Sequence, residues 1–247
     1  MPSWSIHLAI AKEANKKLKL NKNLFYYGNL IPDVDKGTSI SRYAAHFYDN
    51  IPFPKCPKEN MINIDKFLIT YKDNLDNPLI LGYYSHILID NFFNNIVYSN
   101  CWVQNSNNDI IGIKFKNGKI KHIDINDTKN VRRKYKHKDF ELYGKYLYQN
   151  NKVELPTNKN IILSNISKLK PNFLNEELVT KRLNYLKNDF KTFNKLNLFE
   201  RIFKHRYLLF SKEELDNIYN NCIKLIIDEI NKLELENKDK WNTNQNH

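Results

Sequence analysis

A histidine and an aspartate four residues apart form the strongest candidate for metal chemistry in this chain. His86 and Asp90 end the segment Gly-Tyr-Tyr-Ser-His-Ile-Leu-Ile-Asp, which is otherwise largely apolar. Residues at this spacing share one face of a helix. Because a carboxylate buried in apolar surroundings needs a compensating charge, we predict that the pair binds a cation.

Four further segments carry side chains of the same two types. Imidazole and carboxylate ligands without thiolate are typical of a catalytic zinc or mixed-metal site, not of a zinc finger. The sequence therefore predicts a metallohydrolase. The additional candidates are His7, Asp33, Asp35, His46, His137 and Glu141.

Each candidate also has an ordinary structural interpretation. Asp33 and Asp35 follow a proline, where aspartate favours a turn, and we favour Asp33 as the ligand of the two. His137 and Glu141 share a helix face only if the helix includes both. If Asp139 is the N-cap of that helix, His137 lies outside it.

The composition is that of a globular chain with one large domain or a domain with an appendage. Lysine and arginine number 39 against 27 aspartate and glutamate, so the net charge is +12. Such a surface attracts polyanions or anionic lipid, although a lysine-rich solvated surface explains the charge equally well.

The cysteines and the apolar runs predict the compartment. Cys56, Cys101 and Cys222 are far apart and form no C-x-x-C motif, which argues against a disulfide scaffold and a cysteine zinc site. The N-terminus does not resemble a signal peptide, and no apolar run reaches the ~18 residues of a membrane span. We therefore expect a cytoplasmic protein without a transmembrane segment.

The spacing of apolar residues predicts a mainly α fold. A helix is expected from Trp4 to about Leu20, and a long apolar one from Leu79 to about Tyr98 should form the buried centre. Alternation on both sides of Asn117-Gly118 predicts a small β-hairpin inserted at about 110–126.

The C-terminal part is predicted to be helical as well. Ser211 and Glu214 form a capping box, and the amphipathic helix that follows should end near Leu235. We expect a domain over residues 1–155, a C-terminal helical region over 156–235 packed on it, and a frayed tail over 236–247.

The order and separation of these motifs resemble the zinc-dependent phospholipases C. Their superfamily includes single-strand-specific zinc nucleases and the catalytic domain of glycosylphosphatidylinositol phospholipase D. The resemblance covers roughly residues 1–150 and rests on Trp-Ser-Ile-His7-Leu, His46-Phe-Tyr-Asp, Gly82 to Asp90, and His137-Lys-Asp-Phe-Glu141.

The resemblance implies an all-helical phospholipase C/nuclease-like domain that holds up to three zinc ions. In this family, full clusters also use a mature N-terminal tryptophan and a histidine six residues beyond the bridging aspartate. Here Trp4 follows Met-Pro-Ser, and Ile96 stands six residues beyond Asp90, where the family has the histidine. By analogy, Asp33, His46, His86 and Asp90 would hold one ion, Asp90 would bridge to a second held by His7, and His137 and Glu141 would contribute to a third.

The implied reaction is hydrolysis of a phosphodiester by zinc-activated water, and Asp33 or Asp35 could orient that water. The substrate would be a phospholipid head group or nucleic acid, with peripheral contact to anionic surfaces. The alternatives are a single-strand nuclease on the same scaffold and a non-catalytic binding protein that has lost part of the metal cluster.

Overall fold

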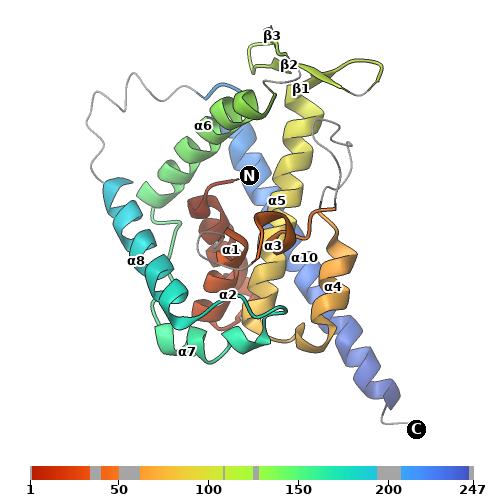
Figure 1. Ribbon diagram of the computed structural model, residues 1–247, viewed down its shortest axis with the longest axis vertical. Helices are drawn as coiled ribbons and strands as arrows, with labels where there is room; N and C mark the ends of the chain where they lie inside the picture. The colour runs from red at the N-terminus through yellow and green to blue at the C-terminus, as the bar shows by residue number, and fades with distance from the viewer. Residues whose placement is uncertain are drawn as a thin grey trace.

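Over the residues that it describes, this computed structural model is mainly helical, with one small three-stranded antiparallel sheet (Figure 1). These residues are 2–33, 40–49, 62–107, 109–124, 128–193 and 207–244. The helices are α1 (Trp4–Leu18), α2 (Lys22–Gly28), α3 (Arg42–Ala45), α4 (Ile64–Tyr71), α5 (Pro78–Cys101), α6 (Thr128–Gln149), α7 (Lys159–Leu163), α8 (Glu176–Phe193) and α10 (Lys212–Asn244). Short 3₁₀ turns are η1 (Ile31–Asp33), η2 (Lys72–Asn74) and η4 (Ile166–Lys168), and the strands are β1 (Trp102–Gln104), β2 (Ile110–Lys114) and β3 (Ile120–His122).

Helix α5 is the central helix that the sequence predicts. The side chain of Asn77 caps it by accepting the N–H of Leu79 at 2.9 Å, and Pro78 occupies the first turn, where a missing N–H costs little. Most residues of α5 are buried, because α1, α2, α4 and α10 pack around this helix (Figure 1). The polar residues Ser85, His86, Asp90 and Asn94 of α5 are therefore held in the core.

Two glycines allow α2 and α5 to cross with their backbones in close contact. A Cβ on Gly82 would lie 2.2 Å from the carbonyl oxygen of Phe25, and one on Gly28 would lie 2.3 Å from that of Leu79. Only glycine fits at these two positions. The crossing brings the end of α2, including Asn29, beside the turn of α5 that carries His86.

The sheet contains the predicted hairpin and one additional strand. Strands β2 and β3 pair antiparallel on either side of a turn in which Gly118 has a φ of 79°, a value that favours glycine. Strand β1 follows α5 directly and pairs with β2. Its three residues are too few to show an alternating pattern, which is why the sequence does not indicate it.

Helix α10 begins at the predicted capping box. Glu214 N–H donates to the hydroxyl of Ser211 at 3.1 Å, and the N–H of Ser211 donates to the Glu214 carboxylate at 2.6 Å. The helix packs against α1 and α5. It continues to Asn244, beyond the end predicted near Leu235, because the apolar period marks only the part of a helix that packs against the core.

Helix α6 begins at Thr128, earlier than the start near Phe140 that the sequence suggests. Asp139 is therefore inside the helix and not at its N-cap. Its buried carboxylate accepts the backbone N–H groups of Leu208, Leu209 and Phe210, just before α10. Asp139 thus joins α6 to the start of α10.

Two expectations from composition can be compared with the described residues. None of their helices is both long and apolar enough to cross a membrane. Cys101 and Cys222 are buried free thiols, and Cys56 lies outside the described residues.

Candidate metal centre

Two histidines and two aspartates from three different segments converge in the core. His46 Nε2 lies 3.4 Å from Asp33 Oδ1 and 3.6 Å from Asp90 Oδ2, and His86 Nε2 lies 3.5 Å from the same Asp90 oxygen. The side chains of His46, His86 and Asp90 are fully buried, and that of Asp33 nearly so. The structure therefore brings together four of the predicted ligands.

Backbone carbonyls fix the orientation of both imidazole rings. His86 Nδ1 lies 2.7 Å from the carbonyl oxygen of Asn29, and His46 Nδ1 lies 2.8 Å from that of Arg42. A carbonyl oxygen only accepts, so Nδ1 of each ring must carry the proton. In the neutral ring, Nε2 then presents its lone pair to the two aspartates, as in most histidine ligands of metals.

The distances within this group fit a shared cation better than hydrogen bonds. Separations of 3.4–3.6 Å exceed the usual ~2.7–3.2 Å of an N–H···O bond. Ligand distances of ~2.0–2.1 Å in a tetrahedral zinc site imply edges of about 3.3–3.4 Å between ligand atoms. Among the described residues, Nε2 of His46 and of His86 and both Asp90 oxygens find no hydrogen-bond partner.

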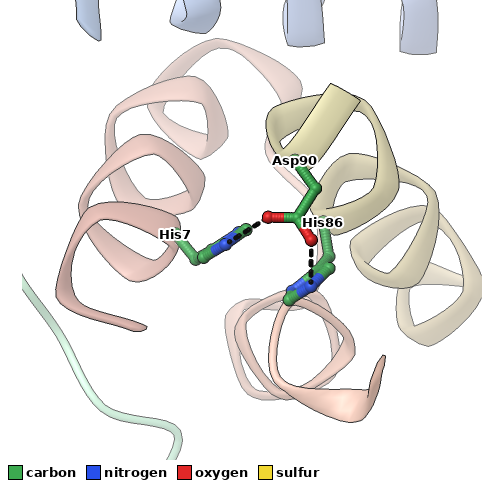
Figure 2. A group of neighbouring side chains, drawn as sticks. All are labelled: His7, His86 and Asp90. Carbon is green, nitrogen blue, oxygen red and sulfur yellow. Dashed lines mark ion pairs between the residues drawn. The ribbon is translucent and has the colours of Figure 1, made fainter. Parts of the chain in front are cut away.

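His7 extends the group on the other side of Asp90. His7 Nε2 lies 3.4 Å from Asp90 Oδ1, the oxygen that faces away from His46 and His86, and its ring stacks on that of His86 at a centroid distance of 4.0 Å. Figure 2 shows His7 reaching from α1 toward the two residues of α5. The Asp90 carboxylate can therefore bridge two cation positions.

Helix α3 and the turn after it position His46. Ser41 caps α3 by accepting the N–H of Ala44 at 3.2 Å, and Tyr83 of α5 donates its hydroxyl proton to the carbonyl of Ala45. Phe47 has a φ of 53°, so the chain turns sharply just after His46. A short helix tied to α5 thus directs the imidazole inward.

Asp33 is held by three residues besides His46. Trp4 Nε1 donates to Oδ2 at 2.7 Å, and Arg42 forms an ion pair with Oδ1 at 2.7 Å. The guanidinium of Arg182, from α8, donates to the backbone carbonyl of Asp33. Both carboxylate oxygens are therefore oriented before any ion binds.

Burial and mutual charge determine the titration of the group. Burial lowers the pKa of His7 to about 4, helped by His86 and opposed by Asp90. Burial alone would raise the pKa of Asp33 and Asp90, but the neighbouring histidines, and for Asp33 also Arg42, hold both pKa values below the usual range. Both carboxylates are therefore ionised at neutral pH.

The remaining predicted ligands are placed elsewhere. His137 and Glu141 lie on α6 as a pair four residues apart, but both are exposed, because α6 turns Lys136 and Phe140 toward the interior. Neither belongs to the two groups of described residues that could hold an ion, which are His7 with His86 and Asp90, and Asp33 with His46 and His86. Asp35 lies outside the described residues.

Several residues of the site are not apparent from the sequence. Trp4 contributes its indole N–H to Asp33, a role distinct from the N-terminal ligand implied by the resemblance. Arg42 lies one helical turn before His46, which is a weak signal. No spacing in the sequence indicates the contact of Arg182 with Asp33, since the two are far apart in the chain.

No protein-family model, curated protein or solved structure matches this chain. The fold and the site define it as a mainly helical protein with a buried histidine–aspartate group that could hold a metal ion. The resemblance to zinc-dependent phospholipases C stays a prediction.

Proposed function

We propose that this chain is a zinc-dependent phosphodiester hydrolase, similar in chemistry to the zinc-dependent phospholipases C. The supporting observation is the arrangement of His46 Nε2, His86 Nε2, Asp33 Oδ1 and Asp90 Oδ2. These electron-pair donors come from three segments of the chain, and the measured pairs lie 3.4–3.6 Å apart in a buried position. Such a group is unfavourable without a positive charge at its centre.

The ligand types favour zinc over magnesium or calcium. Two imidazole nitrogens and two carboxylate oxygens are ordinary zinc ligands, whereas magnesium and calcium prefer sites made of oxygen. When bound, zinc supplies an acidified water molecule and neutralises charge on a phosphoryl group.

Some residues of this chain would hold the ion, and others would orient the attacking water. His46, His86 and Asp90 would hold the ion, with Asp90 also facing His7. Asp33 is fixed by Trp4 and Arg42 and is ionised, so it can both bind the ion and orient the attacking water. Asp35 is the alternative residue for orienting the water.

The substrate would be a phospholipid head group or a nucleic acid, both of which contain phosphodiesters. A net charge of +12 favours approach to either kind of polyanionic surface.

Hydrolysis of a chromogenic phosphodiester by the zinc-loaded protein tests the proposal. We expect turnover that is lost with a chelator and in His86→Ala, because that variant lacks a ligand. His122→Ala is the matched control, since His122 is exposed on β3 and should not affect the rate. Equal rates for wild type and His86→Ala would reject the hydrolase, and less than one zinc per purified chain would favour the non-catalytic alternative.

A further inference from the structure

Two arginines contact Asp33, and each is followed on its helix by an exposed tyrosine. Arg42 and Arg182 contact Asp33 directly. Tyr43 follows Arg42 on α3, and Tyr185 lies one turn after Arg182 on α8. We call Arg42, Tyr43, Arg182 and Tyr185 the arginine–tyrosine cluster. Half of it comes from α8, outside the segment that resembles the phospholipases C.

The two guanidinium groups are fixed in place. Arg42 pairs with Asp33 Oδ1 at 2.7 Å while 40% of its side chain stays exposed. Arg182 stacks on the ring of Trp4 at 4.4 Å and donates to the Asp33 carbonyl. Planar guanidinium groups with several N–H donors are the preferred partners of phosphate oxygens. An anion bound beside Asp33 would lie within reach of both.

The two tyrosines are large exposed aromatics; ring contacts link Tyr43 to His46 through Tyr48, and Tyr185 to Trp4, which donates to Asp33. Tyr43 is 67% exposed and packs on Tyr48 at 5.8 Å, and Tyr48 stacks on His46 at 5.6 Å. Tyr185 is 55% exposed and packs edge-on against Trp4 at 5.5 Å. Exposed rings near the centre can stack on a flat aromatic group.

The local charge becomes positive when a cation binds. Among the residues that the structure describes here, the two carboxylates of Asp33 and Asp90 face the two guanidinium groups of Arg42 and Arg182. A divalent cation between the carboxylates leaves two surplus positive charges in a partly buried region, where charges are screened less than in bulk water. The loaded centre therefore attracts an anion.

We infer that the arginine–tyrosine cluster binds nucleotide phosphodiesters, with phosphate on Arg42 and Arg182 and a base on Tyr43 or Tyr185. The inference rests on the proposed hydrolase function and names single-stranded nucleic acid as its substrate class. Tyrosine rings alone would also suit a choline head group through cation–π contacts. The two arginines disfavour a choline head group, because their positive charges repel its quaternary ammonium.

Calorimetric titration of the zinc-loaded full chain with three small ligands tests this inference without turnover. The ligands are inorganic phosphate, thymidine 5′-monophosphate and phosphocholine. We expect the nucleotide to bind at least tenfold more tightly than phosphate, and phosphocholine no more tightly than phosphate. Tightest binding of phosphocholine, or equal binding of nucleotide and phosphate, would overturn the inference.

Variants assign the binding to the named residues. Arg42→Gln should weaken phosphate and nucleotide at least tenfold, whereas Tyr185→Ala should weaken the nucleotide far more than phosphate. Lys121→Gln removes an exposed positive charge on β3 and should change neither. If Arg42→Gln binds phosphate and nucleotide as tightly as wild type, Arg42 is not part of the anion site. If Arg42→Gln does not fold, Arg42→Lys, which keeps the positive charge, replaces it in the same titration.

The titration distinguishes the failure of this inference from the failure of the proposed function. Turnover of a chromogenic phosphodiester without nucleotide preference leaves the hydrolase standing and rejects the nucleotide site. Nucleotide-selective binding without turnover leaves the site standing and rejects the hydrolase.

Discussion

Replacing Asp90 by asparagine tests directly whether the buried group is organised around a metal ion. The carboxylate faces His7, His46 and His86 at 3.4–3.6 Å. Asparagine keeps the shape but removes the charge, and its amide N–H can donate to an imidazole lone pair. We therefore expect the substitution to affect the protein in opposite directions with and without zinc.

With zinc, the wild-type protein should be the more stable. Zinc at a free concentration of 100 times its Kd stabilises the folded state by about 2.7 kcal/mol. For a chain of this size, about 2–4 °C of melting temperature corresponds to 1 kcal/mol, so zinc should raise the wild-type melting temperature by about 5–11 °C. Asp90→Asn lacks the bridging ligand and should show no such rise.

In the presence of a chelator, the wild-type protein should be no more stable than Asp90→Asn, or less stable. Asp33 and Asp90 are then two ionised carboxylates beside neutral imidazoles, and removing one charge relieves their repulsion. The measurement is thermal unfolding of both proteins at a pH about two units above the ordinary imidazole pKa of about 6.5. Asp228→Asn, on the exposed side of α10, is the matched control.

One result would refute this reasoning. If chelated Asp90→Asn is less stable than chelated wild type by about 3–5 kcal/mol, the cost of breaking a buried ion pair, the histidines are protonated partners of Asp90. The group would then be a salt-bridge network that needs no metal.

Three further outcomes follow from the contacts of the site. Trp4→Phe removes the indole N–H that orients Asp33 and should lower zinc affinity by about 10- to 100-fold in a competitive titration; unchanged affinity would deny the bond a role. Zinc affinity should fall as pH is lowered, about tenfold per unit for each ligand that becomes protonated, beginning above pH 6.5 because Asp90 raises the pKa of His86 against the effect of burial. His137→Ala should leave the zinc content unchanged, whereas a loss of one zinc per chain would restore this histidine to the site.

The backbone crossing of α2 and α5 gives a prediction of stability. In an exposed helix, replacing glycine by alanine stabilises by about 1 kcal/mol. At Gly82, however, the new Cβ would lie 2.2 Å from the carbonyl oxygen of Phe25, so Gly82→Ala should destabilise, typically by about 1–3 kcal/mol for overpacking. Denaturant unfolding measures the sign, and a gain in stability would contradict the close approach.

The elements that sequence reasoning recovers are those with a local signal. The apolar character of α5, the Asn117-Gly118 turn and the Ser211–Glu214 capping box each depend on neighbouring residues, and the structure confirms all three. The pair His86 and Asp90 is predictable for the same reason, since one helix presents both. Spacing alone predicts their common face and, in an apolar helix, their burial.

Spacing fails for α6 because the buried side of that helix is partly polar. Lys136 and Asp139 are buried there, through bonds to Asn94 and to the backbone before α10. Without a clean apolar stripe, the pair His137 and Glu141 looks like an inward face although it is exposed. Long-range polar contacts, like that of Arg182 with Asp33, produce no periodic pattern in the sequence.

The unequal number of ligands around Asp90 predicts the order in which ions bind. On the Oδ2 side, His46, His86 and Asp33 complete a set of four ligand atoms. On the Oδ1 side, the described residues place His7 at 3.4 Å, and the only further candidate ligand is His86, which also belongs to the first group. Zinc should therefore bind in two steps, one tight and one weak.

Substituting His7 separates the two steps. His7→Ala should remove the weak step and leave the tight one, because His7 belongs to only one of the two groups of described residues that could hold an ion. A competitive titration with a chromophoric chelator resolves both affinities. Loss of the tight step in His7→Ala, with retention in His46→Ala, would mean that the ion lies between α1 and α5 and that the four-ligand group is not the primary site.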